Sequence, residues 1–207
     1  MPRLLIALLL IAGPTDSLAG TGAWDFRVLL DGREVGRHLF TLAVEGDEQE
    51  LRSEAQFAVR VLFIDAYRYL HDAVERWNGD CLQSLDARTE TNGRREIVSA
   101  AMQEGRLVVV RPDGRELHEG CVMSFAYWNP EILNARRLLN SQTGELMPVT
   151  ITGQGEETLV VRGQPRTATR HRISAKKLQI DLWYANGQWI ALEALVPGGR
   201  RLRYELI

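Results

Sequence analysis

Apolar and polar residues alternate one by one along most of this chain. Every second residue is apolar between Trp24 and Leu30, and the alternation recurs in residues 54–63 and 178–183. Successive side chains of a β-strand point to opposite faces of a sheet, so this period of two predicts strands with one buried face. The chain is therefore expected to be mostly β.

Short turn sequences separate the alternating segments. They are pairs of the kind found in tight hairpins: Asp31-Gly32, Gly46-Asp47, Asn78-Gly79, Asn92-Gly93, Asp113-Gly114, Asn186-Gly187 and Gly198-Gly199. Such pairs supply positive φ angles, and frequent hairpins make neighbouring strands antiparallel. We expect a single antiparallel meander of about 10–12 strands, which must curl strongly, split into layers or close. The predicted architecture is a strongly curved sheet or an open or half barrel.

Residues 66–77 fit both a helical and a strand periodicity. The Asn-Gly turn that follows favours a strand. In a strand, Tyr67, Tyr69, His71 and Glu75 lie on one face.

One short helix is predicted near residues 130–139. Asn129 is a good N-cap, Pro130 suits the first helical position, and Glu131 adds a favourable charge to the first turn. The helix would interrupt the strands in the middle of the chain.

The N-terminus has the pattern of a secretory signal peptide. A positively charged start precedes the apolar run 4–12, and the small residues Ser17 and Ala19 follow at the positions that signal peptidase recognises. The run is too short for a membrane span, which needs about 20 apolar residues. We expect residues 1–19 to be a signal peptide and residues 20–207 to form a single antiparallel β domain, periplasmic or secreted, with no transmembrane segment.

Composition narrows the function classes. The 207 residues are 45% hydrophobic and 25% charged, with 25 Lys and Arg against 27 Asp and Glu, for a net charge of -2. This balance argues against a polybasic nucleic-acid-binding protein.

The expected export bears on the oxidation state of the two cysteines, Cys81 and Cys121. In an oxidising compartment the simplest state of a lone pair is a disulfide, although two separate thiols remain an alternative. Redox chemistry is disfavoured because a redox pair usually has the Cys-x-x-Cys spacing.

The chain carries no familiar catalytic or metal-binding motif. It has no Gly-x-Ser-x-Gly sequence and no phosphate-binding glycine pattern, and its histidines His38, His71, His118 and His171 lack metal-site spacing. No catalytic residue, metal or cofactor is therefore predicted.

The densest aromatic segment contains Phe125, Tyr127 and Trp128. It is either a core plug at one end of the curved sheet or the wall of a ligand pocket, and both roles are compatible. The other aromatic residues expected at such a pocket are Tyr67, Tyr69 and Trp183, of which Trp183 would alternatively form a cross-strand aromatic pair.

Several blocks resemble an uncharacterised family of bacterial exported proteins, classed as a domain of unknown function. The main ones are Trp-x-Phe-x-Val-x-Leu-Asp-Gly at residues 24–32 and Phe-Ala-Tyr-Trp-Asn-Pro at residues 125–130. Further similar blocks lie at residues 75–79, 140–144 and 181–184. The resemblance implies a periplasmic, mostly antiparallel curved sheet with no known activity.

The leading hypothesis is a non-enzymatic envelope protein that binds an apolar or amphipathic ligand, such as a lipid or isoprenoid, in its curved sheet. One alternative is an enzyme with a dispersed acid–base site that uses His71, Glu75 or Asp181. Another is a structural or partner-binding envelope protein.

Overall fold

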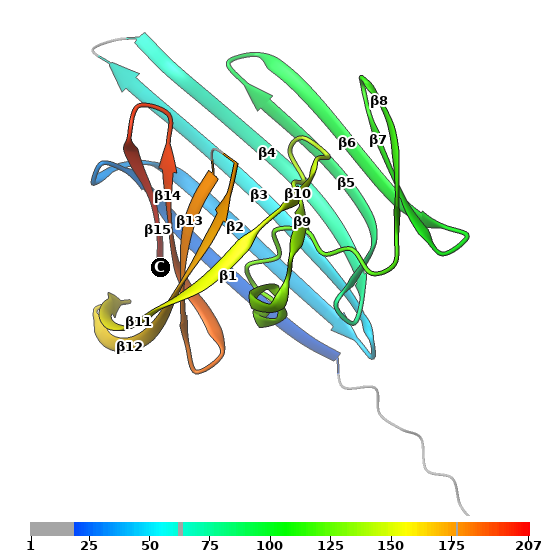
Figure 1. Ribbon diagram of the computed structural model, residues 1–207. Coiled ribbons are helices and arrows are strands. Elements are labelled where there is room, and N and C mark those ends of the chain that lie inside the picture. Colours follow the sequence, from blue (N-terminus) through cyan, green and yellow to red (C-terminus); the bar gives the residue numbers. More distant parts are fainter. Residues whose placement is uncertain (1–18, 62–63, 177) are drawn as a thin grey trace, which may run out of the picture.

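The computed structural model describes residues 19–61, 64–176 and 178–207 (Figure 1). The expected signal peptide therefore lies almost wholly outside the described residues. Strands dominate: β1 (Ala19–Leu30), β2 (Arg33–Glu45), β3 (Glu48–Val61), β4 (Ile64–Asn78), β5 (Cys81–Thr91), β6 (Arg94–Gln103), β7 (Arg106–Arg111), β8 (Gly114–Glu119), β9 (Arg137–Leu139), β10 (Leu146–Pro148), β11 (Thr150–Val161), β12 (Gln164–Ala175), β13 (Leu178–Ala185), β14 (Gln188–Val196) and β15 (Arg200–Leu206).

Thirteen of these strands form one antiparallel sheet in the order β11-β12-β13-β14-β15-β1-β2-β3-β4-β5-β6-β7-β8. The sheet thus consists of two hairpin meanders, β1–β8 and β11–β15, which are joined where β15 pairs with β1. Among the described strands, β8 and β11 are its two free edges, so the sheet is not closed. The predicted antiparallel sheet is confirmed, but the expected count of strands was too low.

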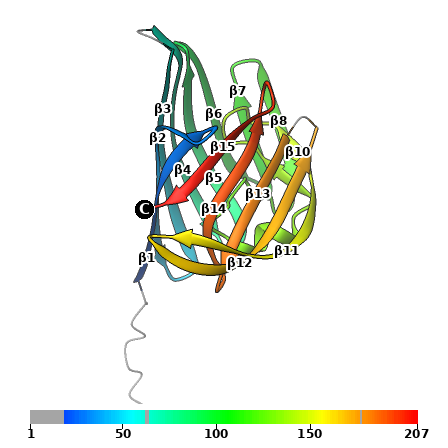
Figure 2. The same ribbon diagram turned by 90° about the vertical axis from the view of Figure 1, so that its left-hand side faces the viewer.

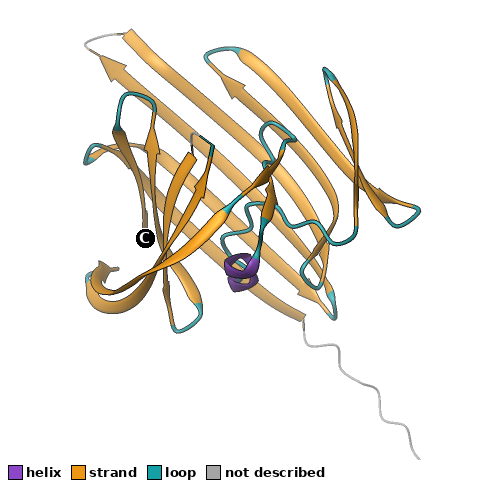
Figure 3. Cartoon of the chain, in the orientation of Figure 1, coloured by secondary structure: helices purple, strands orange, loops and turns teal. Residues whose placement is uncertain are grey.

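The sheet is bent so that β11–β15 face the far part of β1–β8 (Figures 1 and 2). Residues 120–149, which we call the inner segment, run between these two parts and contain a single 3-10 turn, η1 (Pro130–Asn134), together with the β9–β10 pair (Figure 3). Four of its side chains are buried in the main core, those of Val122, Ile132, Leu138 and Leu139. The inner segment therefore fills much of the concave side of the sheet.

The helix predicted at residues 130–139 is wrong beyond its first turn. Asn129 caps η1 as expected, because its side-chain oxygen accepts a hydrogen bond of 2.9 Å from the backbone N–H of Glu131. The chain becomes extended again at Ala135, and β9 then pairs with β10. This extended backbone lets Leu138 and Leu139 both pack in the core.

The two cysteines form a disulfide in the structure. Cys81 begins β5 and Cys121 follows β8, with Cα atoms 4.9 Å apart. Beside the bond, the backbone N–H of Leu82 donates a 2.9 Å hydrogen bond to the carbonyl of Val122. The start of the inner segment is thereby attached to the sheet.

None of the helical structure in the described ranges is long and apolar enough to cross a membrane.

Candidate functional site

A cavity of about 210 Å³ lies between the concave face of the sheet and the inner segment. Strands β2–β4, strands β13–β15 and the inner segment all supply lining residues. The lining residues are His38, Phe40, Leu51, Ser53, Tyr69, His71, Ala73, Glu75, Phe125, Tyr127, Asn140, Ser141, Gln142, Leu178, Ile180, Leu192, Ala194, Leu202 and Tyr204.

His38 is at the centre of a buried polar group on this concave face. Its Nδ1 lies 3.2 Å from the hydroxyl of Tyr204, and its Nε2 lies 2.7 Å from Oγ of Ser53. The ring also stacks on Phe40, with centroids 3.9 Å apart. Burial lowers the pKa of His38 well below its usual value, and the nearby His71 lowers it further. The imidazole is therefore neutral near pH 7.

His71 and Glu75 project from the same face of β4, as the strand periodicity predicts. Nδ1 of His71 lies 2.9 Å from Oγ1 of Thr89, and burial lowers the pKa of His71 to about 4. Glu75 is only 6% exposed, and its Oε2 accepts a hydrogen bond of 3.0 Å from the Ser124 hydroxyl. Burial raises the pKa of Glu75 to about 7, against the opposing effects of Ser124 and the Trp77 indole, which favour the charged form.

The tyrosines that line the cavity are uncharged as well. The pKa values of Tyr69, Tyr127 and Tyr204 are raised by burial above the ordinary 10, so these phenols are neutral at physiological pH, as tyrosines usually are. Phe125 and Tyr127 have ring centroids 6.2 Å apart on the inner segment. The cavity therefore combines aromatic walls with buried, mostly uncharged polar groups.

Three of the six aromatic residues that the sequence suggested line this cavity: Phe125, Tyr127 and Tyr69. Trp128 instead packs in the core, edge-on to Trp77 at a centroid distance of 5.8 Å. Whether the lining residues bind a ligand stays a prediction.

Tyr67 and Trp183 lie outside the lining. Tyr67 is 38% exposed near the turn between β3 and β4. Trp183 is on the outer face, where the guanidinium groups of Arg170 and Arg203 each lie 5.1 Å from its ring. Strand alternation explains this position, because the neighbouring Tyr184 points inward to the main core.

The three residues considered for acid–base chemistry do not all meet. His71 and Glu75 line the cavity, whereas Asp181 belongs to a charged cluster with Arg170 and Arg172. Burial acts to raise the pKa of Asp181, but hydrogen bonds from Arg172 and Arg170 lower it overall. Asp181 is therefore a stably ionised partner of two arginines.

Sequence reasoning missed the roles of His38, Ser53 and Tyr204. The available signal was a polar residue on an otherwise apolar strand face, as at His38, two residues before Phe40. Their mutual contacts depend on pairing between distant strands, which no local pattern reveals.

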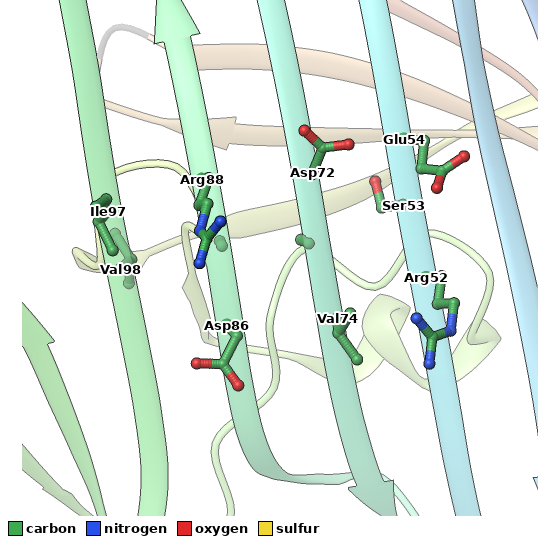
Figure 4. A pocket seen from close by; sticks show the side chains of 11 residues that line it. Arg52, Ser53, Glu54, Asp72, Val74, Asp86, Arg88, Ile97 and Val98 are labelled. Atoms are coloured by element: carbon green, nitrogen blue, oxygen red, sulfur yellow. The ribbon is translucent and has the colours of Figure 1, made fainter.

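A larger depression, of about 410 Å³, lies on the outer face of β3–β6. Figure 4 shows the charged side chains there, Arg52, Glu54, Asp72, Asp86 and Arg88, standing on the side of the sheet away from η1. These five residues are exposed. A solvated charged surface is common on any protein, so the concave cavity with its buried polar groups is the stronger candidate.

Within the described ranges, no group of three or more His, Cys, Asp or Glu side chains is arranged to hold a metal ion.

Comparisons with known proteins agree with this architecture. The model of the family "Domain of unknown function (DUF6134)" matches residues 26–207. A crystal structure of a beta-barrel-like protein of domain of unknown function DUF1849 from Brucella abortus is similar, with a TM-score of 0.67 over 92% of this chain and 97% of that chain. The two sequences are 11% identical, so this likeness shows a shared fold. No curated protein matches the chain.

Proposed function

Since the chain belongs to the DUF6134 family of domains of unknown function, its activity has to be inferred from its own geometry, and we propose that it binds an amphipathic, lipid-like ligand in the concave cavity. In this proposal it is an exported envelope protein that binds without catalysing a reaction. The observation that carries the proposal is a cavity that combines aliphatic side chains, mainly from β13–β15, with buried polar groups, mainly from β2–β4.

Most of the aliphatic lining comes from the C-terminal meander, which also contributes the hydroxyl of Tyr204. Leu178, Ile180, Leu192 and Leu202 of β13–β15 line the cavity. Burying a hydrocarbon chain there removes apolar surface from water, which contributes roughly 25 cal/mol per Å².

Most of the polar groups come from the N-terminal meander, which also contributes Phe40, Leu51 and Ala73 to the lining. His38, Ser53, His71 and Glu75 lie on β2–β4 and can orient the polar end of a ligand. The cavity, at about 210 Å³, is smaller than the roughly 300–1,000 Å³ typical of drug-sized pockets. It therefore fits one end of an amphiphile, with the remainder of the ligand outside.

Two features support export to an oxidising compartment. The first nineteen residues match a signal peptide, and the Cys81–Cys121 disulfide is of a kind that persists mainly outside the cytosol.

The test is native mass spectrometry of the purified protein, followed by extraction and identification of any bound molecule. We expect an amphiphile to co-purify with the wild type and to be absent from Ala194→Trp, in which an indole would occupy the cavity. Val160→Trp is the control because Val160 is 77% exposed. The proposal fails if the wild type carries no ligand and binds none that is offered.

The convergence of His71 and Glu75 in one cavity favours a second candidate, an enzyme with acid–base chemistry. The extracted amphiphile should then be returned chemically altered after incubation with the wild type, and unaltered with His71→Gln. Return of the intact molecule in both cases excludes this candidate for that ligand.

A further inference from the structure

We propose that the ligand of the concave cavity carries a protonated amine, which pairs with the carboxylate of Glu75. The inference rests on the proposed function and specifies the chemical class of the ligand.

Glu75 is buried without a cation. Among the described residues the Ser124 hydroxyl donates a hydrogen bond to it, and the indole of Trp77 also favours its charged form, but no arginine or lysine lies within ion-pair distance of it. A buried carboxylate is costly unless it is paired. The fold therefore leaves an unmatched acid that a cationic ligand would satisfy.

Glu75 is also the single Asp, Glu, Lys or Arg among the described residues that line the cavity. An anionic head group would meet this acid with no positive side chain among the described lining residues. A neutral head group would leave the carboxylate unpaired or force it to keep its proton. A cation therefore gains most from this lining.

The aromatic walls favour the same chemistry. Phe125, Tyr127 and Tyr69 line the cavity together with Glu75. The faces of aromatic rings attract cations within about 6 Å, and the attraction increases in a desolvated site. An ammonium group would thus find both a counter-ion and aromatic surfaces, while its hydrocarbon chain contacts the leucines of β13–β15.

The other titratable groups around the cavity leave the charge of Glu75 uncompensated. They are His38 on β2, Tyr69 and His71 on β4, Tyr127 on the inner segment, Tyr184 on β13 and Tyr204 on β15. Burial keeps both imidazoles neutral near pH 7, and the four phenols, with pKa values raised above 10, are neutral there as well. Amine binding should therefore strengthen from pH 6 to pH 8 as Glu75 ionises, because an alkyl amine stays protonated throughout this range.

The experiment compares n-octylamine, n-octanol and n-octanoate by isothermal titration calorimetry with the purified protein. These probes share one chain length and differ in head-group charge. We expect octylamine to bind roughly ten- to a hundred-fold more tightly than octanol, as for a hydrogen bond to a charged group. Octanoate should bind most weakly.

The isosteric variant Glu75→Gln keeps an acceptor for Ser124 and should remove the preference for the amine and its pH dependence. Glu54→Gln on the outer face is the matched control and should bind as the wild type does. Because the three probes are compared first on the wild type, the result stands even if a variant folds poorly.

Equal or tighter binding of octanol or octanoate, or amine affinity that falls from pH 6 to pH 8, overturns the inference and leaves the proposed function intact. Unchanged amine affinity in a folded Glu75→Gln protein also overturns the inference and leaves the proposed function intact. Failure of all three probes to bind contradicts the proposed function itself.

Discussion

The buried carboxyl of Glu75 destabilises the folded protein when it is ionised. It lies on the inner face of β4 with Ala73 and Trp77 as its nearest buried neighbours on that face. Burial raises its pKa to about 7 from an ordinary value of 4.5. The folded protein thus holds this proton to a higher pH than the unfolded chain does.

The raised pKa of Glu75 makes the stability of the folded protein depend on pH. The contribution of Glu75 to stability is fully present below about pH 4.5 and is lost as the pH rises to about 7. We predict that Glu75→Gln without ligand is more stable than the wild type at pH 8 by up to about 3 kcal/mol, and no more stable at pH 4. Urea denaturation at both pH values measures the difference, and a gap of the same size at each pH would contradict it.

The sequence predicted which face of the sheet a side chain lies on wherever strand alternation determines it. The shared inward face of Tyr69, His71 and Glu75 followed from the period of two. The same rule, applied consistently, would have placed Trp183 on the outer face. The contact of His38 with Tyr204 joins residues 166 positions apart and has no local signal.

At the level of elements, local sequence signals predicted where the helical turn of the inner segment begins but not how long it is. The Asn129-Pro130 sequence correctly marks the start of a helical turn. Its length is decided by packing, because Leu138 and Leu139 are both fully buried against the sheet. Residue types near a helix start do not encode that tertiary contact.

The close approach of β2 to β3 at Gly36 leads to a prediction. A Cβ atom at Gly36 would overlap the backbone carbonyl of Gln56, which a flexible side chain could not relieve. We expect Gly36→Ala to lower the free energy of unfolding by about 3 kcal/mol or more.

Gly153→Ala on β11 is the control, since a Cβ there would meet no atom within 4 Å. Its stability should stay within about 0.5 kcal/mol of the wild type. Comparable losses in the two variants, measured by chemical denaturation, would show that the contact at Gln56 is not responsible.

The disulfide supplies a second prediction for an element. It closes a loop with a sequence separation of 40 and ties the inner segment to β5. Replacing Cys81 and Cys121 together by serine should lower the free energy of unfolding by about 2–5 kcal/mol. A reducing agent should destabilise the wild type similarly and leave the double variant unchanged, whereas a wild type insensitive to reduction would refute the role assigned to the bond.

For the molecule as a whole, the inner segment holds the two meanders together. The backbone carbonyl of Tyr127 accepts a 2.7 Å hydrogen bond from Tyr184 on β13, and Trp128 packs on Trp77 of β4. A segment in contact with both parts should make them unfold as one unit.

We therefore predict that Trp128→Ala lowers the free energy of unfolding by about 3–5 kcal/mol, the usual cost of removing a large buried side chain. Intrinsic fluorescence and far-UV circular dichroism should still report one shared transition. Tyr67→Ala, at a largely exposed position, should cost much less. Separate transitions for the two probes would mean that the meanders are stable independently.

The pairing of β15 with β1 has a consequence for how the protein reaches its native state. The ion pair between Arg27 and Glu205 on these strands joins residues 178 positions apart. Until β15 is available, β1 presents an unpaired edge, which is the kind of surface that recruits other chains. Folding dominated by such distant contacts is slow. A chain that is made from its N-terminus would thus carry an unpaired sheet edge until its last strand is made, and its folding yield should depend on how well that edge is shielded before then.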